Sequence, residues 1–102
     1  MKRAHMFVAT LVMACCAAPA ANAADGKAIY DMSCAGCHSR GLLGSPKTGD
    51  KDAWGPRIQN GQAALEESVI KGKGKMLPKG GNDSLSADDI KTTIEYMLSK
   101  VK

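Results

Sequence analysis

Cys34-Ala35-Gly36-Cys37-His38 is the stretch that decides the interpretation of this chain. In a CxxCH motif, two thiols three positions apart can bond to the two vinyl groups of one porphyrin, and the adjacent imidazole can then ligate the iron. The motif predicts one haem c, covalently bound through Cys34 and Cys37, with His38 as a ligand of the iron. Zinc knuckles and dithiol redox proteins contain similar runs, so the rest of the sequence has to decide between these kinds of site.

The first 23 residues have the pattern of a secretory signal peptide. A basic start at Lys2 and Arg3 is followed by an apolar run over residues 7–18 and by a small-residue Ala-Asn-Ala cleavage site that ends at position 23. The apolar run is shorter than the about 20 residues that a helix needs to span a bilayer. We therefore expect residues 1–23 to be removed during export.

Export agrees with the predicted cofactor, because c-type haem is attached outside the cytoplasm. We expect residues 24–102 to form one haem domain in the periplasm, with no transmembrane segment. Cys15 follows a run that loosely resembles a lipobox, but the apolar core before it is very short, so lipid anchoring through Cys15 is the disfavoured alternative. Because Cys15 and Cys16 precede the cleavage site, the mature chain keeps only Cys34 and Cys37, and no thiol is left for a disulfide.

Cleavage after position 23 would leave 79 of the 102 residues, a size at which burial of a core alone gives marginal stability. The aromatic residues that remain are Tyr30, Trp54 and Tyr96, which is a poor supply for an apolar interior. A bound macrocycle would provide that interior. We therefore predict that the haem is the core of the domain and that the chain without haem is largely unfolded.

Counting histidines restricts the second axial ligand. His5 lies in the signal peptide and His38 is already used, so a haem with two imidazole ligands cannot form within one chain. Of the remaining methionines, Met32 is on the same side as His38, and Met97 falls in an apolar stripe with helical spacing. Met76 instead lies in a loop rich in glycine and lysine, where it has no packing reason to be. A soft thioether suits haem iron, so we predict Met76 as the ligand and an exposed methionine as the alternative.

The spacing of apolar residues predicts an all-α domain with helices over residues 25–33, 62–71 and 87–101. Ser86 is the expected N-cap of the last helix, with carboxylates in its first turn. Residues 41–60 are rich in glycine, proline and polar residues and are expected to be a long irregular segment folded over the cofactor. Ile29 and Tyr30 are the expected buried positions of the first helix, and Leu65, Val69 and Ile70 form the apolar stripe of the second. Leu85 and Ile90 occupy the positions of a hydrophobic staple at the start of the last helix.

Other interpretations of the motif find no support in the sequence. Runs of alternating β-branched residues are absent, which argues against a thioredoxin-like arrangement. Cys34, Cys37 and His38 offer three zinc ligands with no fourth cysteine or histidine in the mature chain. Without Lys2 and Arg3 the net charge falls from +4 to +2, which is too small to indicate a nucleic-acid-binding protein.

Beyond CxxCH, the chain resembles the class I c-type cytochromes, and among them the cytochrome c5 family of small bacterial monohaem carriers. The resemblance implies a small cytochrome c fold of three to four helices wrapped around one covalently bound haem, in a protein that is not an enzyme. It covers most of residues 25–98. The matching landmarks, in the same order and spacing, are CAGCH at 34–38, SPKTGD at 45–50, WGPRI at 54–58, KGKGKMLPKGG at 71–81 and EYM at 95–97.

The resemblance also implies roles for individual residues. Pro46 matches the proline whose carbonyl accepts the Nδ1 proton of His38, although Pro46 could equally be only a turn former. Trp54 and Arg57 match positions beside the haem propionates, where an indole N–H and a guanidinium would bind carboxylate; the alternative for Arg57 is a solvated charge. Two further positions, Gly26 and Tyr96, match the crossing of the first and last helices.

The loop around Met76 departs from the pattern of the family. Many cytochromes c5 carry an extra disulfide just beyond this loop, but residues 80–85 contain no cysteine. Leu77 also replaces a proline that often follows the ligand. These departures imply a loop that opens more easily.

An iron with both axial positions filled by protein ligands exchanges electrons and does little bond chemistry. We therefore predict a periplasmic carrier, a monomer or weak dimer, that shuttles electrons between donors and acceptors of a respiratory chain. Two alternatives stay open: a haem subunit fixed in a larger oxidoreductase, and a gas-binding haem with a labile Met76. Redox partners with acidic surfaces could dock at a lysine cluster, the alternative being solvated loop charges. The cluster consists of Lys71, Lys73, Lys75 and Lys79.

Overall fold

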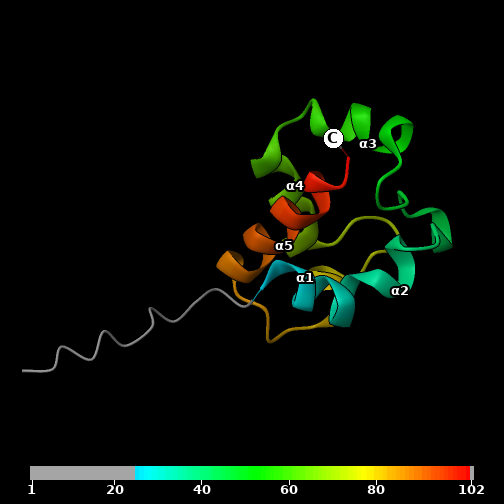
Figure 1. Cartoon of the computed structure of the whole chain (residues 1–102). Coiled ribbons are helices and arrows are strands. Elements are labelled where there is room, and N and C mark those ends of the chain that lie inside the picture. The colour runs from blue at the N-terminus through cyan, green and yellow to red at the C-terminus, as the bar shows by residue number, and fades with distance from the viewer. Residues whose placement is uncertain (1–24, 102) are drawn as a thin grey trace, which may run out of the picture.

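The computed structural model describes residues 25–101, so the predicted signal peptide and its cleavage site lie outside the described residues. Residues 25–101 form helices and loops without a β-strand, which confirms the predicted all-α fold. In Figure 1, α5 lies between α1 and α4. In chain order the elements are α1 (Gly26–Ile29), the π-helix η1 (Tyr30–Cys34), α2 (Ala35–His38), the 3-10 helix η2 (Leu42–Gly44), α3 (Lys51–Ile58), α4 (Gln62–Lys71), the 3-10 helix η3 (Pro78–Gly81) and α5 (Ala87–Ser99).

The first helical segment is longer than the sequence predicts, because α1, η1 and α2 follow one another without a break. It begins at Asp25, whose side chain accepts a hydrogen bond from the backbone N–H of Lys27. Between Tyr30 and Cys34 the helix widens by one residue, so that the N–H of Ala35 donates to the carbonyl of Tyr30, five positions earlier. The CxxCH motif therefore lies inside a helix rather than after one.

The crossing of α1 and α5 requires glycine at position 26. A Cβ atom on Gly26 would lie 2.5 Å from the carbonyl oxygen of Thr92, which is closer than nonbonded atoms approach. One turn later, the rings of Tyr30 and Tyr96 pack with their centroids 5.3 Å apart. The small residue and the aromatic ring at this crossing are those that the resemblance implies.

Helices α4 and α5 begin where the sequence predicts. Ser86 caps α5 in a reciprocal capping box with Asp89, in which each side chain accepts from the other residue's backbone N–H. Of the apolar stripe predicted for α4, Ile70 is 39% exposed. Val69 packs against the core, and adjacent residues of a helix point about 100° apart, so Ile70 faces outward.

The prediction of an irregular segment over residues 41–60 is wrong in part, because α3 lies within it. Asp50 caps this helix by accepting from the backbone N–H groups of Asp52 and Ala53. Trp54 anchors it by packing into a buried cluster with residues of the first and last helices. The cap and the buried indole stabilise the helix although Pro56 removes one of its N–H donors.

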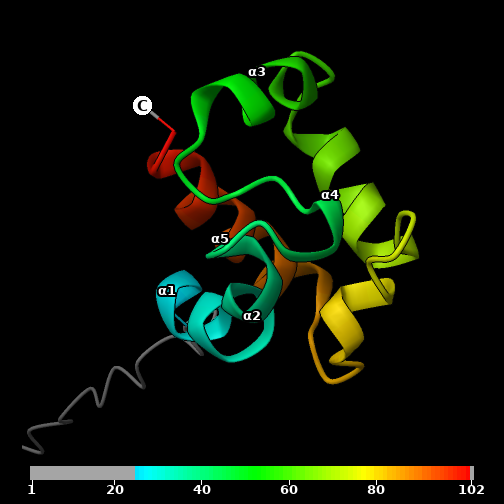
Figure 2. The same cartoon turned by 90° about the vertical axis from the view of Figure 1, so that its right-hand side faces the viewer.

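The buried side chains form two clusters along α5. One consists of Ile29, Leu85, Ile90 and Ile94, and the other of Tyr30, Trp54 and Met97. Figure 2 shows the other elements arranged around α5. The segment that joins α2 to α3 crosses the centre of the view. Within residues 25–101, no helix has the length and apolar character of a membrane span.

Candidate haem-binding site

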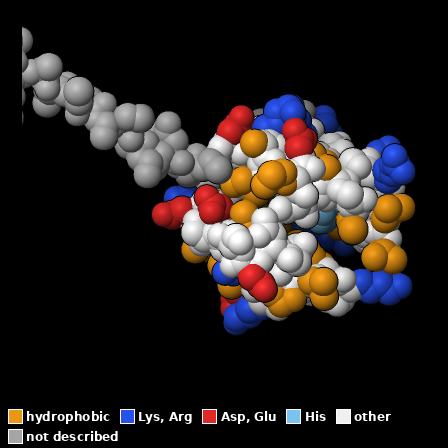
Figure 3. Space-filling view, turned by 90° about the horizontal axis from the view of Figure 1, so that it is seen from below, with side chains coloured by type: hydrophobic (Ala, Val, Ile, Leu, Met, Phe, Trp, Pro, Cys, Tyr) orange, Lys and Arg blue, Asp and Glu red, His pale blue; other side chains and the backbone are white. Residues whose placement is uncertain are grey.

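A cavity of about 520 Å³ opens between the CxxCH helix and the loop that carries Met76. Its volume is in the range of small-molecule and cofactor sites. Figure 3 shows a hollow on this side of the molecule. A histidine side chain lies in the wall of the hollow, and hydrophobic side chains lie around it. The apolar lining comes mainly from α4 and α5 and includes Leu65, Val69, Ile90, Ile94, Met97 and Leu98.

Both thiols of the motif line this cavity and neither is in a disulfide. Cys34 is half-buried, and burial raises the pKa of its thiol, whereas Cys37 is exposed. Within residues 25–101, no group of three or more histidine, cysteine, aspartate or glutamate side chains could hold a metal ion by itself. Two thiols, one imidazole and one thioether on an apolar cavity fit a haem, which brings its own four nitrogen ligands.

His38 is held by hydrogen bonds to residues 46–48, which we name the proximal strap. The Nδ1 atom of His38 lies 2.9 Å from the carbonyl oxygen of Pro46, the contact that the resemblance implies. The carbonyl oxygen of His38 in turn accepts from the backbone N–H of Thr48 at 2.7 Å. His38 is only 8% exposed, so both ends of the residue are fixed inside the protein.

The bond to Pro46 also determines which nitrogen of His38 is available. A carbonyl oxygen only accepts hydrogen bonds, so Nδ1 must carry the proton that is donated to Pro46. The other ring nitrogen, Nε2, is then unprotonated in the neutral imidazole and can ligate a metal. The strap therefore selects the tautomer of His38 that a proximal ligand requires.

Two further hydrogen bonds attach the proximal strap to the helices. The indole N–H of Trp54 donates to the carbonyl oxygen of Lys47 at 2.9 Å, and the hydroxyls of Tyr30 and Thr48 lie 2.8 Å apart. The Trp54 ring also lies beside the imidazole of His38, with centroids 6.0 Å apart. Each of the three strap residues is thus bonded to a different part of the protein.

The indole N–H of Trp54 has a protein partner in this structure. It is the single donor of the ring and is used on Lys47, so the bond to a propionate that the resemblance implies would require this N–H to change partner. Trp54 still lines the cavity and is buried. Arg57 lines the cavity too, and one of its nitrogens donates to the carbonyl of Ala53 one turn earlier. A guanidinium has five N–H donors, so Arg57 keeps others with which to bind a carboxylate.

Met76 reaches the cavity from residues 72–81, which we name the methionine loop. Its side chain is half-buried, and its backbone exchanges two hydrogen bonds of 3.0 and 2.9 Å with Lys73 in a tight turn. Gly72 packs under this turn, where a Cβ atom would lie 2.9 Å from the carbonyl oxygen of Met76. Met97 is buried in the core, as the sequence predicts, and Met32 is exposed and does not line the cavity.

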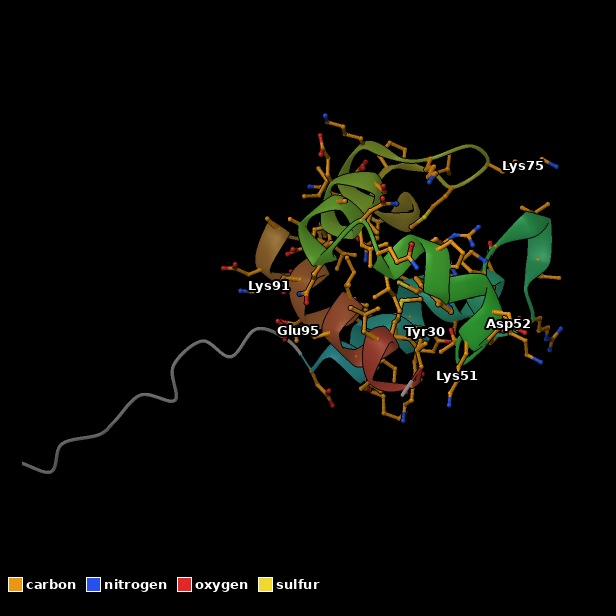
Figure 4. All side chains as sticks on the ribbon, turned by 90° about the horizontal axis from the view of Figure 1, so that it is seen from above. Tyr30, Lys51, Asp52, Lys75, Lys91 and Glu95 are labelled. Carbon is orange, nitrogen blue, oxygen red and sulfur yellow. The ribbon has the colours of Figure 1, made fainter. Side chains whose placement is uncertain are left out.

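The structure separates the members of the lysine cluster. Lys73, Lys75 and Lys79 line the mouth of the cavity, and Figure 4 shows Lys75 extending outward from its loop. Lys71 lies outside the lining and is bonded to Glu67 on the exposed surface of α4. This hydrogen bond lowers the pKa of the Glu67 carboxyl.

Sequence reasoning missed two contacts beside the cavity. One is the pair of hydroxyls on Tyr30 and Thr48, and the other is a 3.0 Å hydrogen bond from the side-chain amide of Asn82 to the hydroxyl of Ser33. Serine, threonine and asparagine are common in loops, so nothing in their identity indicates a partner 18 or 49 positions away. No pattern in one sequence could have found these pairs.

Comparisons with known proteins agree with this site. The family described as "Cytochrome C oxidase, cbb3-type, subunit III" matches residues 21–97, and cytochrome c-555 of Chlorobaculum tepidum is 47% identical over 85 residues, 79% of each chain. The chain belongs to the cytochrome c family. Cytochrome c5 of Ectopseudomonas mendocina is 37% identical to this cytochrome c over 71 residues, 68% of this chain and 82% of the relative.

Solved structures are similar to this cytochrome c as well. A cytochrome c from the crystal structure of an electron transfer complex with nitrite reductase has a TM-score of 0.74 and 35% identity, over 78% of this chain and 96% of that one. These matches confirm the resemblance to small class I cytochromes c, including cytochrome c5. The cofactor is therefore one covalently bound haem c, with Cys34 and Cys37 at the attachment spacing.

Proposed function

We propose that this cytochrome c is a periplasmic one-electron carrier in which Cys34 and Cys37 hold the haem and His38 and Met76 are its axial ligands. One observation carries the proposal: an imidazole and a thioether from two different segments line the same apolar cavity. When bound, the haem supplies the exchange of a single electron between its ferric and ferrous states. Neither axial position is left for a substrate, so the proposed activity is electron transfer without bond chemistry.

The residues of the chain orient and shield the cofactor. Pro46 fixes the ring orientation and the tautomer of His38. The apolar lining from α4 and α5 excludes water and lowers the local dielectric, which favours the form of the iron with the smaller net charge. Arg57 is the cationic side chain that we assign to a propionate.

We infer that redox partners dock at the mouth of the cavity. Leu43 and Leu77 line the cavity and are each 65% exposed, and Lys73, Lys75 and Lys79 line the same cavity. An apolar patch with a basic rim suits a partner whose own patch has an acidic rim. The similar cytochrome c in the nitrite reductase complex supports a redox protein as the kind of partner.

The named relatives do not favour a haem subunit fixed in a larger complex. Cytochrome c-555 of Chlorobaculum tepidum matches this chain over 79% of its own length, and the cytochrome c5 over 82%, so the relatives are proteins of comparable size. The pattern of residues 1–23 supports export to the periplasm.

Replacing the predicted ligand tests the proposal. Met76→Ala should keep the covalent haem, lose the weak far-red absorption band of a thioether on ferric iron, and bind carbon monoxide in the ferrous state. Met32→Ala is the control, because Met32 is exposed and away from the cavity, and it should leave both properties unchanged. A Met76→Ala protein with the spectrum of the parent would contradict the assignment of Met76.

A further inference from the structure

The methionine loop is held mainly by hydrogen bonds within itself. Its first half closes through the paired bonds of Lys73 and Met76, and its second half through a bond from the N–H of Gly80 to the carbonyl of Leu77. Lys79, Gly80 and Gly81 all have positive φ angles, of 56°, 62° and 83°, so the second half is a tight left-handed turn. These bonds shape the loop but do not fix its distance from the helix that carries the thiols.

One residue after this turn, Asn82 joins the loop to that helix. Its side-chain amide nitrogen donates to the hydroxyl of Ser33 at 3.0 Å, and Ser33 immediately precedes Cys34. Gly80 packs against the same place, where a Cβ atom would lie 3.1 Å from the carbonyl oxygen of Ser33. The loop is therefore seated directly on the residue beside the first thioether position.

Asn82 uses all four of its polar groups in this arrangement. Its backbone N–H donates to Lys79, its carbonyl accepts from Leu85, its side-chain oxygen accepts from the N–H of Ser84, and its side-chain nitrogen donates to Ser33. The two backbone bonds fix the main chain at Asn82, and the bond from Ser84 orients its side chain. An oriented side chain loses little conformational entropy when it makes the fourth bond.

We propose that Asn82 and Ser33 are positioning residues, whose hydrogen bond limits the opening of the methionine loop and so the replacement of Met76 by an added ligand. The inference rests on the proposed ligation by Met76. An external ligand can enter only when the thioether has left, so its apparent affinity rises with the fraction of protein in the open state. A contact that exists only in the closed state lowers that fraction.

The test is a titration of the ferric holoprotein with imidazole, followed by the loss of the far-red thioether band. Ser33→Ala removes the hydroxyl that accepts the bond and should tighten the apparent binding of imidazole about fivefold, which corresponds to about 1 kcal/mol. Asn82→Ala should tighten it at least as much, and adding Ser33→Ala to Asn82→Ala should change little further. Ser33→Thr keeps the hydroxyl and should restore the parental affinity.

Two control variants separate loop opening from general loss of stability. Ser39→Ala removes a serine hydroxyl on the other side of the CxxCH motif that is bonded only within its own helical segment, to Ala35. Ser86→Ala removes a comparable hydrogen bond at the start of α5, from a residue that does not line the cavity. Both should leave imidazole affinity near that of the parent.

The possible results separate the positioning role of Asn82 and Ser33 from the proposed ligation by Met76. A parent protein without the far-red band would overturn both the ligation by Met76 and the role of Asn82. A parent with the band, and a Ser33→Ala variant whose imidazole affinity is unchanged or shifts no more than that of Ser86→Ala, would overturn only the positioning role.

Discussion

The proximal strap and the methionine loop are short segments on two sides of one cavity, and they are attached to the protein in different ways. The strap has three residues, and each of them is hydrogen-bonded to a side chain or backbone group elsewhere in the fold. The loop, residues 72–81, closes mostly on itself and has one side-chain bond to the CxxCH helix, through Asn82 just beyond its end. The difference implies a fixed imidazole side and an adjustable thioether side.

Removing the covalent anchors should have the largest effect. A Cys34→Ala and Cys37→Ala double variant should retain no haem under denaturing conditions, and its chain should be largely unfolded, because an apolar cavity of about 520 Å³ loses its filling. Circular dichroism and a haem stain of a denaturing gel measure both effects. Met76→Ala should keep both haem and fold, so an equally unfolded Met76→Ala protein would break the contrast between the two sides.

The next largest effect is expected at the base of the methionine loop. Gly72→Ala places a Cβ atom 2.9 Å from the Met76 carbonyl oxygen at φ 83° and ψ 157°, a conformation that suits only glycine. We expect it to cost about 3 kcal/mol or more and to weaken the far-red band, as measured by thermal unfolding and by absorption. Gly74→Ala, in the same loop, has φ 59° and open space around the new atom, and should cost about 1–2 kcal/mol. Equal losses in both would show that close packing at Gly72 is unimportant.

A smaller loss of stability is expected in the proximal strap. Thr48→Val removes the hydroxyl that pairs with Tyr30 and keeps the shape of the side chain. It should cost about 1 kcal/mol and lower the melting temperature by about 4–8 °C, without change in the far-red band. Thr92→Val, whose hydroxyl is bonded within its own helix on the exposed surface, is the matched control and should stay near the parent. A weaker far-red band in Thr48→Val would mean that the two sides are coupled.

The smallest effect on the fold is expected from the lysines, which should change only association with a partner. Lys75→Ala should slow electron transfer to an acidic redox protein at low ionic strength, and the difference should vanish in high salt. Lys71→Ala should have less effect at neutral pH, because Glu67 already compensates its charge. The lowered pKa of Glu67 keeps that pair ionised until the pH falls through this pKa, below which Lys71→Ala should approach Lys75→Ala. Identical salt dependence of both variants at neutral pH would contradict the assigned roles.

The sequence predicts the residues that bind haem better than the hydrogen bonds that hold those residues in place. Cys34, Cys37, His38 and Met76 are recognisable because only a few residue types can bind haem, and the structure brings them to one cavity. The partner of the Trp54 indole is a backbone carbonyl, and carbonyls carry no residue-type signal.

Helix boundaries show the same limit. The capping box predicts the start of α5 because the cap and its partner are three positions apart. Helix α3 was not predictable in the same way, since Gly55 and Pro56 indicate a break, and the burial of Trp54 that stabilises the helix depends on segments far away in the chain.

The widened turn between Tyr30 and Cys34 means that the geometry of the haem-attachment pentapeptide depends on the residues before it. An extra residue in one turn rotates everything after it, so the part of the helix before the turn presents Ile29 and Tyr30 to the core while the part after it presents thiols and imidazole to the cavity. Grafting CxxCH alone onto a regular helix of another scaffold would aim those groups in the wrong direction. A design with this geometry also has to include residues 30–33, which complete the widened turn before the pentapeptide.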